Sequence, residues 1–187
     1  MSGNVLNCSG WCDEDKQGGY YRNYFPKASQ YHISMREIRI YEGYDKSISK
    51  KPDVAIDLER PLNPSLVGRY DIVICHTVLE HVFNIFTAFE NLAALSRDIV
   101  IVIVPWSQQV HECNSSDDVF HDYWRFSPSA LKRLHEINRL SLIYLNGNWD
   151  YHASTYYISV GSKRPDSHKD IMRLSPSCVP DGSNIYW

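Results

Sequence analysis

Three histidines lie in polar surroundings where a side chain could transfer a proton. His81 follows Glu80 in the stretch HTVLEHV, and His111 and His121 lie in the polar, aromatic segment of residues 107–126. Imidazole titrates near neutral pH, which suits a general base. All three are therefore candidate catalytic residues, and the sequence leaves open which one acts. In the structural alternative, Glu80 stabilises the start of a helix electrostatically and His81 is a buried, hydrogen-bonded histidine.

The stretch HDYWRFSP has the composition of a substrate-binding segment. Tyr123 and Trp124 offer flat apolar surfaces, and Arg125 offers a planar cation. We take these three residues, with Glu80, as candidate substrate-binding residues. In the structural alternative, Trp124 and Phe126 anchor the segment to the core while Arg125 pairs with a carboxylate such as Asp117 or Asp118.

Two groups of residues could suggest a metal site. His76 and Glu80 are four residues apart, but they lack the HExxH pattern that places two imidazoles on one ion. His111, Cys113 and His121 could be zinc ligands, yet their spacing matches no common zinc motif. The sequence therefore predicts no metal site.

The elements that must position these residues alternate between β-rich runs and amphipathic stretches, which predicts an α/β fold with a mostly parallel sheet. The run at 98–106 is apolar and β-branched throughout, which indicates a central strand buried on both faces. The last two runs are expected to form an antiparallel pair. Seven strands are predicted, at residues 4–9, 29–35, 52–59, 70–75, 98–106, 140–150 and 154–163.

Two helices follow from the pattern. After His76 and Thr77, apolar residues recur at helical spacing from Leu79 to Leu95, so His76 and Glu80 would share one helical face. The stretch SPSALKRLHEI predicts a second helix with Ser127 as N-cap, followed by proline at the first helical position. We expect a single domain over residues 1–163 and an extended or mobile tail over residues 164–187.

Composition bounds the function. A chain of 187 residues with 43% hydrophobic and 22% charged residues suits one globular domain. Its formal charge of −3 disfavours nucleic acid and anionic membranes as partners, and its longest apolar run is too short for a bilayer span of about 20 residues. We expect a cytoplasmic protein, with its five cysteines mostly as thiols. The 13 tyrosines and 5 tryptophans make a homo-oligomer conceivable.

Two blocks of sequence carry a resemblance to a known family. YDIVICHTVLEHV is similar to the fourth strand and following helix of class I S-adenosylmethionine-dependent methyltransferases, particularly small bacterial ones of the methyltransferase-11 type. The block VPW followed by HDYWRFSPSALKRL resembles their fifth strand, loop and helix. The resemblance spans roughly residues 5–163. It implies a Rossmann-like sheet of seven strands with an antiparallel last strand, helices on both faces, and S-adenosylmethionine as cofactor.

The family's cofactor lies at the carboxyl ends of the strands, so the resemblance also implies cofactor-binding residues. Glycine is common after the first strand because it lets the backbone approach the cofactor closely. Gly10 fits this need, whereas Cys8 and Cys12 stand where the family often has glycine, and Asn7 replaces an acidic residue. The implied cofactor-binding residues at this bend and beside the fourth strand are Asn7, Ser9, Gly10, Asp13 and His76.

Three further positions correspond to the family's contacts with the nucleoside. Ser34 stands in the place of the carboxylate that normally binds the ribose hydroxyls, and it can make fewer hydrogen bonds. Asp57 matches the acidic residue that would accept a hydrogen bond from the adenine amino group, and Leu58 would pack against the ring.

The leading hypothesis is methyl transfer to a small-molecule acceptor such as a sugar or secondary metabolite, with an oxygen acceptor favoured. The alternative is a non-catalytic or repurposed member of the same fold, acting as a subunit or binding module. The cysteines in the first bend and the missing ribose carboxylate favour the alternative. A nicotinamide-dependent oxidoreductase is a weaker possibility because the bend lacks GxGxxG.

Overall fold

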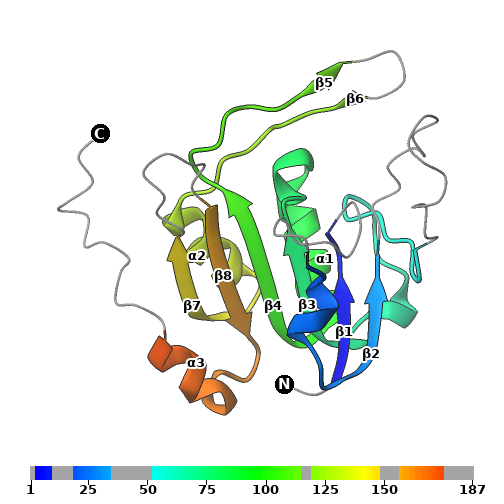
Figure 1. Cartoon of the computed structure of the whole chain (residues 1–187), viewed down its shortest axis with the longest axis vertical. Coiled ribbons are helices and arrows are strands. Elements are labelled where there is room, and N and C mark those ends of the chain that lie inside the picture. Colours follow the sequence, from blue (N-terminus) through cyan, green and yellow to red (C-terminus); the bar gives the residue numbers. More distant parts are fainter. Residues whose placement is uncertain (1–2, 10–18, 35–51, 115–118, 148–155, 175–187) are drawn as a thin grey trace.

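A six-stranded sheet forms the centre of the molecule (Figure 1), in a computed structural model that describes residues 3–9, 19–34, 52–114, 119–147 and 156–174. The strand order is β2-β1-β3-β4-β8-β7. The first four of these strands are parallel, and β8 runs antiparallel to both β4 and β7. The predicted antiparallel last strand is therefore confirmed. The strands are β1 (Gly3–Asn7), β2 (Ala28–Ile33), β3 (Tyr70–His76), β4 (Ser96–Pro105), β7 (Ser141–Gly147) and β8 (Tyr156–Ser162).

The strand predicted at residues 52–59 is wrong. Ile56 and Leu58 are buried, as the alternating pattern indicated, but the backbone here forms no strand. The side-chain amide of Asn91 donates instead to the carbonyl oxygens of Leu58 and Arg60, both at 2.8 Å. Burial on alternate residues thus arises here without a ladder partner, because a helix side chain satisfies the backbone.

The long helices are α1 (Ile85–Leu95) and α2 (Pro128–Ile137). The Ser127 hydroxyl accepts from the Ala130 N–H at 3.2 Å, which confirms the predicted N-cap. The first helix begins later than expected, because Asn84 caps it and only the short 3-10 helix η3 (Leu79–His81) precedes it. The sequence had predicted that His76 and Glu80 share a helical face. This is wrong, because His76 ends β3 while Glu80 lies in η3.

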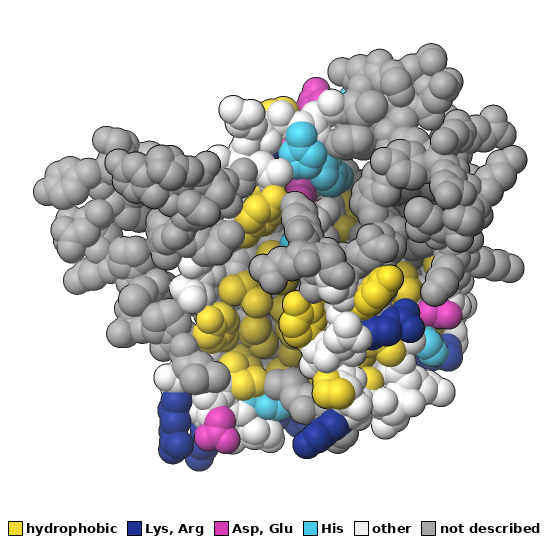
Figure 2. Space-filling model, in the orientation of Figure 1, with side chains coloured by type: hydrophobic (Ala, Val, Ile, Leu, Met, Phe, Trp, Pro, Cys, Tyr) yellow, Lys and Arg dark blue, Asp and Glu magenta, His cyan; other side chains and the backbone are white. Residues whose placement is uncertain are grey.

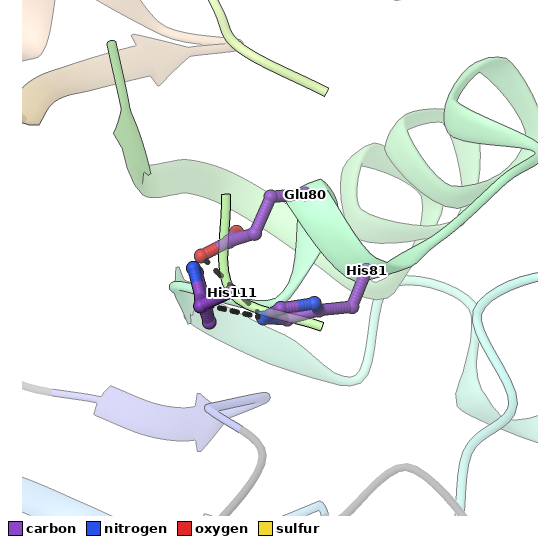
Figure 3. A group of neighbouring side chains, drawn as sticks. All are labelled: Glu80, His81 and His111. Carbon is purple, nitrogen blue, oxygen red and sulfur yellow. Dashed lines mark hydrogen bonds and ion pairs between the residues drawn. The ribbon is translucent and has the colours of Figure 1, made fainter. Parts of the chain in front are cut away.

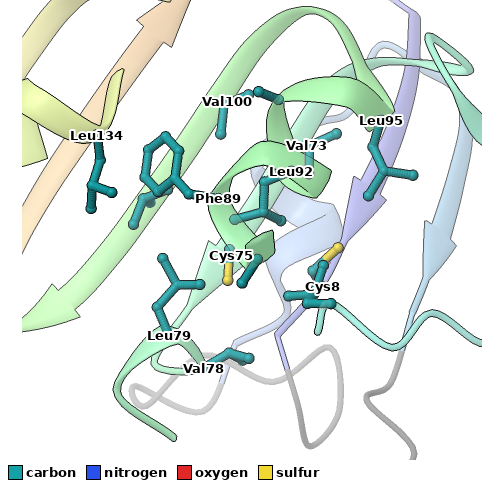
Figure 4. Packing of buried hydrophobic residues seen from close by; sticks show 14 of the residues in the cluster. Cys8, Val73, Cys75, Val78, Leu79, Phe89, Leu92, Leu95, Val100 and Leu134 are labelled. Atoms are coloured by element: carbon teal, nitrogen blue, oxygen red, sulfur yellow. The ribbon is translucent and has the colours of Figure 1, made fainter. Parts of the chain in front are cut away.

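The larger part of the core lies between the sheet and the two long helices (Figure 4). Phe89 and Leu92 of α1 and Leu134 of α2 pack there with Val73 and Val100 of the central strands. Each of these side chains is at most 5% exposed. This packing fixes β3 and β4 side by side, so the segments that leave their carboxyl ends start from rigid positions.

The other face of the sheet carries a second cluster of alternate strand residues, including Val5, Ile72 and Ile99. On the face turned to the viewer, Figure 2 shows hydrophobic side chains gathered over the strands. Phe25, after the 3-10 helix η1 (Tyr21–Tyr24), and Ile171, in α3 (Lys169–Leu174), pack against this cluster. Helical segments therefore contribute to both faces, as predicted.

The first part of the expected tail is ordered. The chain after Lys163 forms the 3-10 helix η4 (Pro165–His168) and then α3, where an extended or mobile tail was expected. The residues of the loop after β4 include a small hairpin, β5 (Cys113–Asn114) with β6 (Val119–Phe120). Among the described residues, no helix is long and apolar enough to cross a membrane.

Candidate functional site

The sheet reverses its direction of growth at β1, and this reversal locates the site. β1 has β2 as its neighbour on one side and β3 on the other, and all three strands are parallel. Their carboxyl ends therefore meet at one edge, where their arrowheads point in Figure 1. Open α/β sheets bind ligands outside this edge, at the point where strand order reverses. Four of the predicted cofactor-binding residues lie at this edge: Asn7, Ser9, Ser34 and His76.

Asn7 shapes the bend after β1. Its side chain is fully buried, and its Oδ1 accepts from the Ser9 N–H at 2.9 Å. The Asn7 carbonyl accepts from the Ser34 N–H at 2.8 Å, which ties the end of β2 to the same bend. The Ser9 hydroxyl in turn accepts from the His76 N–H at 3.2 Å. An amide thus replaces the expected acidic residue as the group that turns the chain, and the ends of three strands are held together.

Cys8 has a structural role in place of the expected glycine. Its side chain is 3% exposed and belongs to the core cluster on the α1 side of the sheet. Burial raises the pKa of its thiol to about 12, so it is not a reactive thiolate at neutral pH. Gly10, Cys12 and Asp13, which the sequence assigned to the same bend, lie outside the described residues.

The two predicted adenine contacts lie in different surroundings. Leu58 is 3% exposed and belongs to the core cluster, so its side chain offers little open surface, and its contact with a cofactor ring stays a prediction. Asp57 is exposed, but its Oδ1 accepts from the Glu59 N–H at 2.8 Å, and its Oδ2 lies 3.8 Å from Nε of Arg60. The carboxylate of Asp57 therefore closes its own turn.

His76 occupies the centre of the edge. Its Nδ1 is hydrogen-bonded to the hydroxyl of Tyr21, and its ring makes edge contacts with Tyr21 and Tyr156 at centroid distances of 5.4 and 6.4 Å. The Tyr156 hydroxyl donates to Oε1 of Gln108 at 2.5 Å. The next residue, Thr77, has a φ of 49°, an uncommon value for a β-branched side chain. Such backbone strain concentrates at functional sites.

Glu80, His81 and His111 converge beside this edge (Figure 3). Glu80 and His81 come from η3, and His111 comes from the loop after β4. The two Nε2 atoms of the histidines lie 3.2 Å apart, and Nε2 of His81 lies 3.9 Å from Oε1 of Glu80. Glu80 is fully buried, while the side chains of His81 and His111 are 19% and 38% exposed. The sequence did not predict that His81 and His111 lie together, because they are 30 residues apart.

Asp122 contacts the cluster, although the sequence did not select it as a site residue. Its Oδ2 lies 3.1 Å from Nδ1 of His111 and accepts from the backbone N–H of His111 at 2.9 Å. Both Asp122 oxygens also accept from Arg125, at 2.5 and 2.6 Å. Although burial alone would raise the pKa of Asp122, the bonds from Arg125 and His111 hold it below its usual value. The signal in the sequence was the three-residue spacing of Asp122 and Arg125 on the segment that precedes α2.

The guanidinium of Arg125 makes hydrogen bonds within the protein. Besides Asp122, its guanidinium donates to the carbonyl oxygens of Gln108 and Gln109 at 2.9 and 3.0 Å. The hydrogen bond to Asp122 raises the pKa of Arg125. Arg125 therefore pairs with a carboxylate, as the structural alternative expected, but the partner is Asp122, while Asp117 and Asp118 lie outside the described residues. Phe126, 3% exposed, anchors the segment to the core, as that alternative expected.

Aromatic side chains form a partly exposed surface next to the cluster. Tyr123 and Trp124 are 43% and 36% exposed, and both lie against Phe83, with ring centroids 5.2 and 6.4 Å away. The Trp124 indole donates to the carbonyl of Val82 at 2.8 Å, so its plane is fixed. His121 is exposed, and its ring lies 5.4 Å from that of Tyr123. Its backbone carbonyl, and not its ring, bonds to the cluster through Nδ1 of His81.

Comparison with known proteins identifies the fold. No protein-family model and no curated protein matches the chain. Among solved structures, a 1,6-didemethyltoxoflavin-N1-methyltransferase from Burkholderia thailandensis with bound S-adenosylhomocysteine has a TM-score of 0.57 and 14% identity, over 86% of this chain and 70% of that one. A complex of DhpI with S-adenosylhomocysteine has a TM-score of 0.57 and 15% identity, over 85% and 76%. An S-adenosylmethionine-dependent methyltransferase from Methanosarcina mazei has a TM-score of 0.52 and 10% identity, over 86% and 92%.

These matches cover most of the described sheet and helices, and they share a fold at low identity. The chain therefore has the fold of class I S-adenosylmethionine-dependent methyltransferases, as the sequence resemblance implied. The strand at residues 52–59 that would complete the expected seven is absent from the described sheet.

Proposed function

We propose that this protein transfers a methyl group from S-adenosylmethionine to an oxygen of a small-molecule acceptor. The fold supports this proposal, since its structural neighbours include enzymes described with S-adenosylhomocysteine bound. The observation that carries it is the convergence, at the switch point of the sheet, of the buried Asn7 bend, His76 and a carboxylate with two imidazoles. The proposed cofactor site at the Asn7 bend would therefore lie next to a group that can transfer a proton.

The cofactor would lie against the bend of Asn7 and Ser9, with Ser34 and His76 on either side. These four residues are already joined by hydrogen bonds from backbone N–H groups, so the bend is preorganised. Preorganisation reduces the cost of ordering the protein on binding. Ser34 stands where a carboxylate normally binds the ribose hydroxyls, and it offers fewer hydrogen-bond acceptors. We therefore expect the ribose to be bound more weakly than a carboxylate would bind it.

The reaction needs alignment and removal of one proton. The acceptor oxygen forms a bond to the methyl carbon as the carbon–sulfur bond breaks, and the sulfur takes the electron pair of that bond. The acceptor hydroxyl loses its proton in the same process. We assign assistance of this step to the cluster of Glu80, His81 and His111, because its polar atoms meet at one point. His121 has no side-chain bond to this cluster and is the least favoured of the three predicted bases.

The acceptor would rest on the aromatic surface of Phe83, Tyr123 and Trp124. Fixed aromatic planes favour flat or apolar portions of a ligand. This favours an acceptor with an aromatic or otherwise apolar body and one reactive hydroxyl over a bare sugar. The negative formal charge of the chain remains a reason to disfavour polyanionic acceptors.

A second function is favoured by two observations. Leu58 is buried in the core and offers little surface to an adenine ring, and one oxygen of the Asp57 carboxylate already accepts a hydrogen bond within its own turn. A repurposed protein that keeps the sheet and acts as a binding module would show this pattern.

Calorimetric titration with S-adenosylmethionine and with S-adenosylhomocysteine separates the two functions. The methyltransferase proposal predicts binding of both in the micromolar range. Absence of heat at millimolar ligand would contradict the methyltransferase proposal and favour the binding module. The variant His76→Phe keeps an aromatic ring against Tyr21 and Tyr156 but removes both ring nitrogens. We expect the affinity for the cofactor to fall about tenfold or more, because roughly one hydrogen bond between neutral groups is lost.

The matched control is His168→Phe. His168 bonds to Asp98 near the start of β4, at the opposite end of the sheet from the carboxyl edge. The same chemical change there should leave cofactor affinity unaltered. Equal losses in both variants would mean that the binding place is not at the His76 edge.

A further inference from the structure

The Nε2 atoms of the two histidines in the cluster lie 3.2 Å apart. Nδ1 of His81 lies 2.8 Å from the carbonyl oxygen of His121, which can only accept, so this nitrogen carries the hydrogen. Nδ1 of His111 lies 3.1 Å from the Asp122 carboxylate, another acceptor, so it carries its hydrogen too. In the neutral form of each ring, Nε2 is then a lone pair. The 3.2 Å between the two Nε2 atoms therefore places two lone pairs face to face.

A cation between them resolves this repulsion, and Glu80 adds a negative charge to the same point. The Glu80 carboxylate is fully buried, and its Oε1 lies 3.9 Å from Nε2 of His81. Burying a carboxylate is costly unless a positive group or hydrogen bonds stabilise it. The ligand atoms of all three side chains lie within 4.8 Å of one another. Figure 3 shows the three side chains turned toward a common centre.

The spacing suits a transition metal. Two imidazole nitrogens that bind one tetrahedral zinc ion at about 2.0 Å each are separated by about 3.3 Å. The observed separation of the Nε2 atoms is 3.2 Å. The distance from Glu80 to His81 is slightly longer, and a small rotation of the carboxylate shortens it. Two histidines and one carboxylate form the ligand set of catalytic zinc sites and of non-haem iron sites, both of which keep a position open for solvent or substrate.

The surroundings also match those of a metal site. Metal-binding histidines usually donate their second ring N–H to a carboxylate or a backbone carbonyl, which fixes the ring and its tautomer. His111 makes the first kind of bond, to Asp122, and His81 makes the second, to the carbonyl of His121. Asp122 is held in turn by two bonds from Arg125. The geometry therefore orients both rings before any cation binds.

We propose that Glu80, His81 and His111 bind one divalent transition-metal cation, with Zn²⁺ as the reference ion. The role of this cation rests on the proposed function. The cation would bind the hydroxyl of the methyl acceptor at the coordination position that the protein leaves open. A bound cation lowers the pKa of such a hydroxyl, whose proton then passes to solvent, and the resulting oxygen anion attacks the methyl carbon as the carbon–sulfur bond breaks. In this form the two histidines act as ligands and do not accept the proton themselves. The more exposed His111 marks the side from which the acceptor enters.

The test is metal binding by the full chain, measured without activity. Protein freed of metal by a chelator is titrated with Zn²⁺ by calorimetry and with Co²⁺ by visible absorption. We expect one site with micromolar or tighter affinity, and Co²⁺ bands typical of nitrogen and oxygen ligands. His111→Ala and Glu80→Gln should each weaken binding about a hundredfold or more, which exceeds the tenfold to hundredfold typical of outer-shell changes. Because thiols elsewhere in the chain can bind zinc, the site is read from the difference between variants and wild type.

The control is His121→Ala. Its ring does not join the cluster, and the carbonyl that bonds His81 belongs to the backbone, so metal affinity should stay within twofold. Thermal melting of each variant shows whether it is folded. The metal proposal would be overturned if the wild type had no binding site, or if wild type and His111→Ala bound the metal equally well. A proton shared between the two rings would then explain their short distance. S-adenosylhomocysteine binding by the metal-free protein tests the proposed function separately.

Discussion

His135 is a titratable residue enclosed by the core. It lies in α2, it is 0% exposed, and its ring stands edge-on to Phe89 at 5.0 Å. Its Nε2 lies 3.1 Å from the hydroxyl of Ser159, whereas Nδ1 has no hydrogen-bond partner among the described residues. Burial lowers the pKa of His135 to about 4, so the folded protein holds a neutral imidazole here.

This pKa predicts a pH dependence of stability between pH 7 and 5. Below the unfolded pKa of about 6.5, the unfolded chain binds a proton that the folded chain does not bind until about pH 4, so stability is full above pH 6.5 and falls as pH drops. We expect the free energy of unfolding, measured in urea, to be about 2 kcal/mol lower at pH 5 than at pH 7. His135→Gln should lose most of this dependence. The same slope in that variant would assign the effect to other groups.

At the scale of elements, α2 sits close to β8 because one residue has no side chain. A Cβ placed on Gly161 of β8 would lie 2.3 Å from Nδ1 and 2.8 Å from Cε1 of His135. The ring is itself fixed by Phe89, so it cannot move aside without disturbing the core. Gly161 therefore sets the distance between the helix and the strand.

Gly161→Ala should destabilise the protein by overpacking, by about 1–3 kcal/mol in urea unfolding. The double-mutant cycle with His135→Ala isolates the cause, because removing the ring makes room for the methyl group. In the His135→Ala background, the cost of Gly161→Ala should fall below about 1 kcal/mol. Additive costs would show that the strain lies in the backbone of β8.

At the scale of the whole molecule, one buried carboxylate fastens the chain after β8 to the sheet. Asp98, 3% exposed near the start of β4, accepts from the Ser162 hydroxyl at 2.6 Å and from His168 Nε2 at 2.8 Å. Arg164 donates to it through its guanidinium at 2.9 Å and its backbone N–H at 3.2 Å. Burial alone would raise the pKa of Asp98, but the bonds from Ser162 and His168 hold it below its usual value.

Asp98→Asn should loosen this attachment, since an amide cannot accept from all these donors. We expect a loss of about 1.5–3 kcal/mol at pH 7 and faster tryptic cleavage between Arg164 and Arg173. Because the folded pKa is lowered, the contribution of Asp98 is present above its unfolded pKa of about 3.9 and is lost as pH falls through the lower folded value. Asp166→Asn, an exposed change in the same segment, is the control and should alter neither measurement. Equal cleavage in both variants would contradict the anchor.

The parts of the fold that the sequence predicted are those set by local chemistry. The apolar run at 98–106 became the central strand β4, and Ser127 with Pro128 began α2 at the expected residue. Glu80, His81 and His111 were predicted as site residues from the sequence, but Asp122 and the arrangement of the cluster were not. His81 and His111 were both selected, but for the same role and not as a pair. The strand at residues 52–59 was wrongly predicted because an alternating pattern records which side chains are buried and not whether the backbone joins a sheet.

The sequence by itself determined most of the segments that form the mostly parallel sheet, because periodicity and capping act over a few residues. Only the tertiary structure decided that Glu80, His81 and His111 share one point and that Asp122 orients His111. Those contacts join the end of β3 to the loop after β4, and their geometry depends on the packing that sets these two strands side by side. No spacing along the chain encodes a distance of 3.2 Å between nitrogens 30 residues apart.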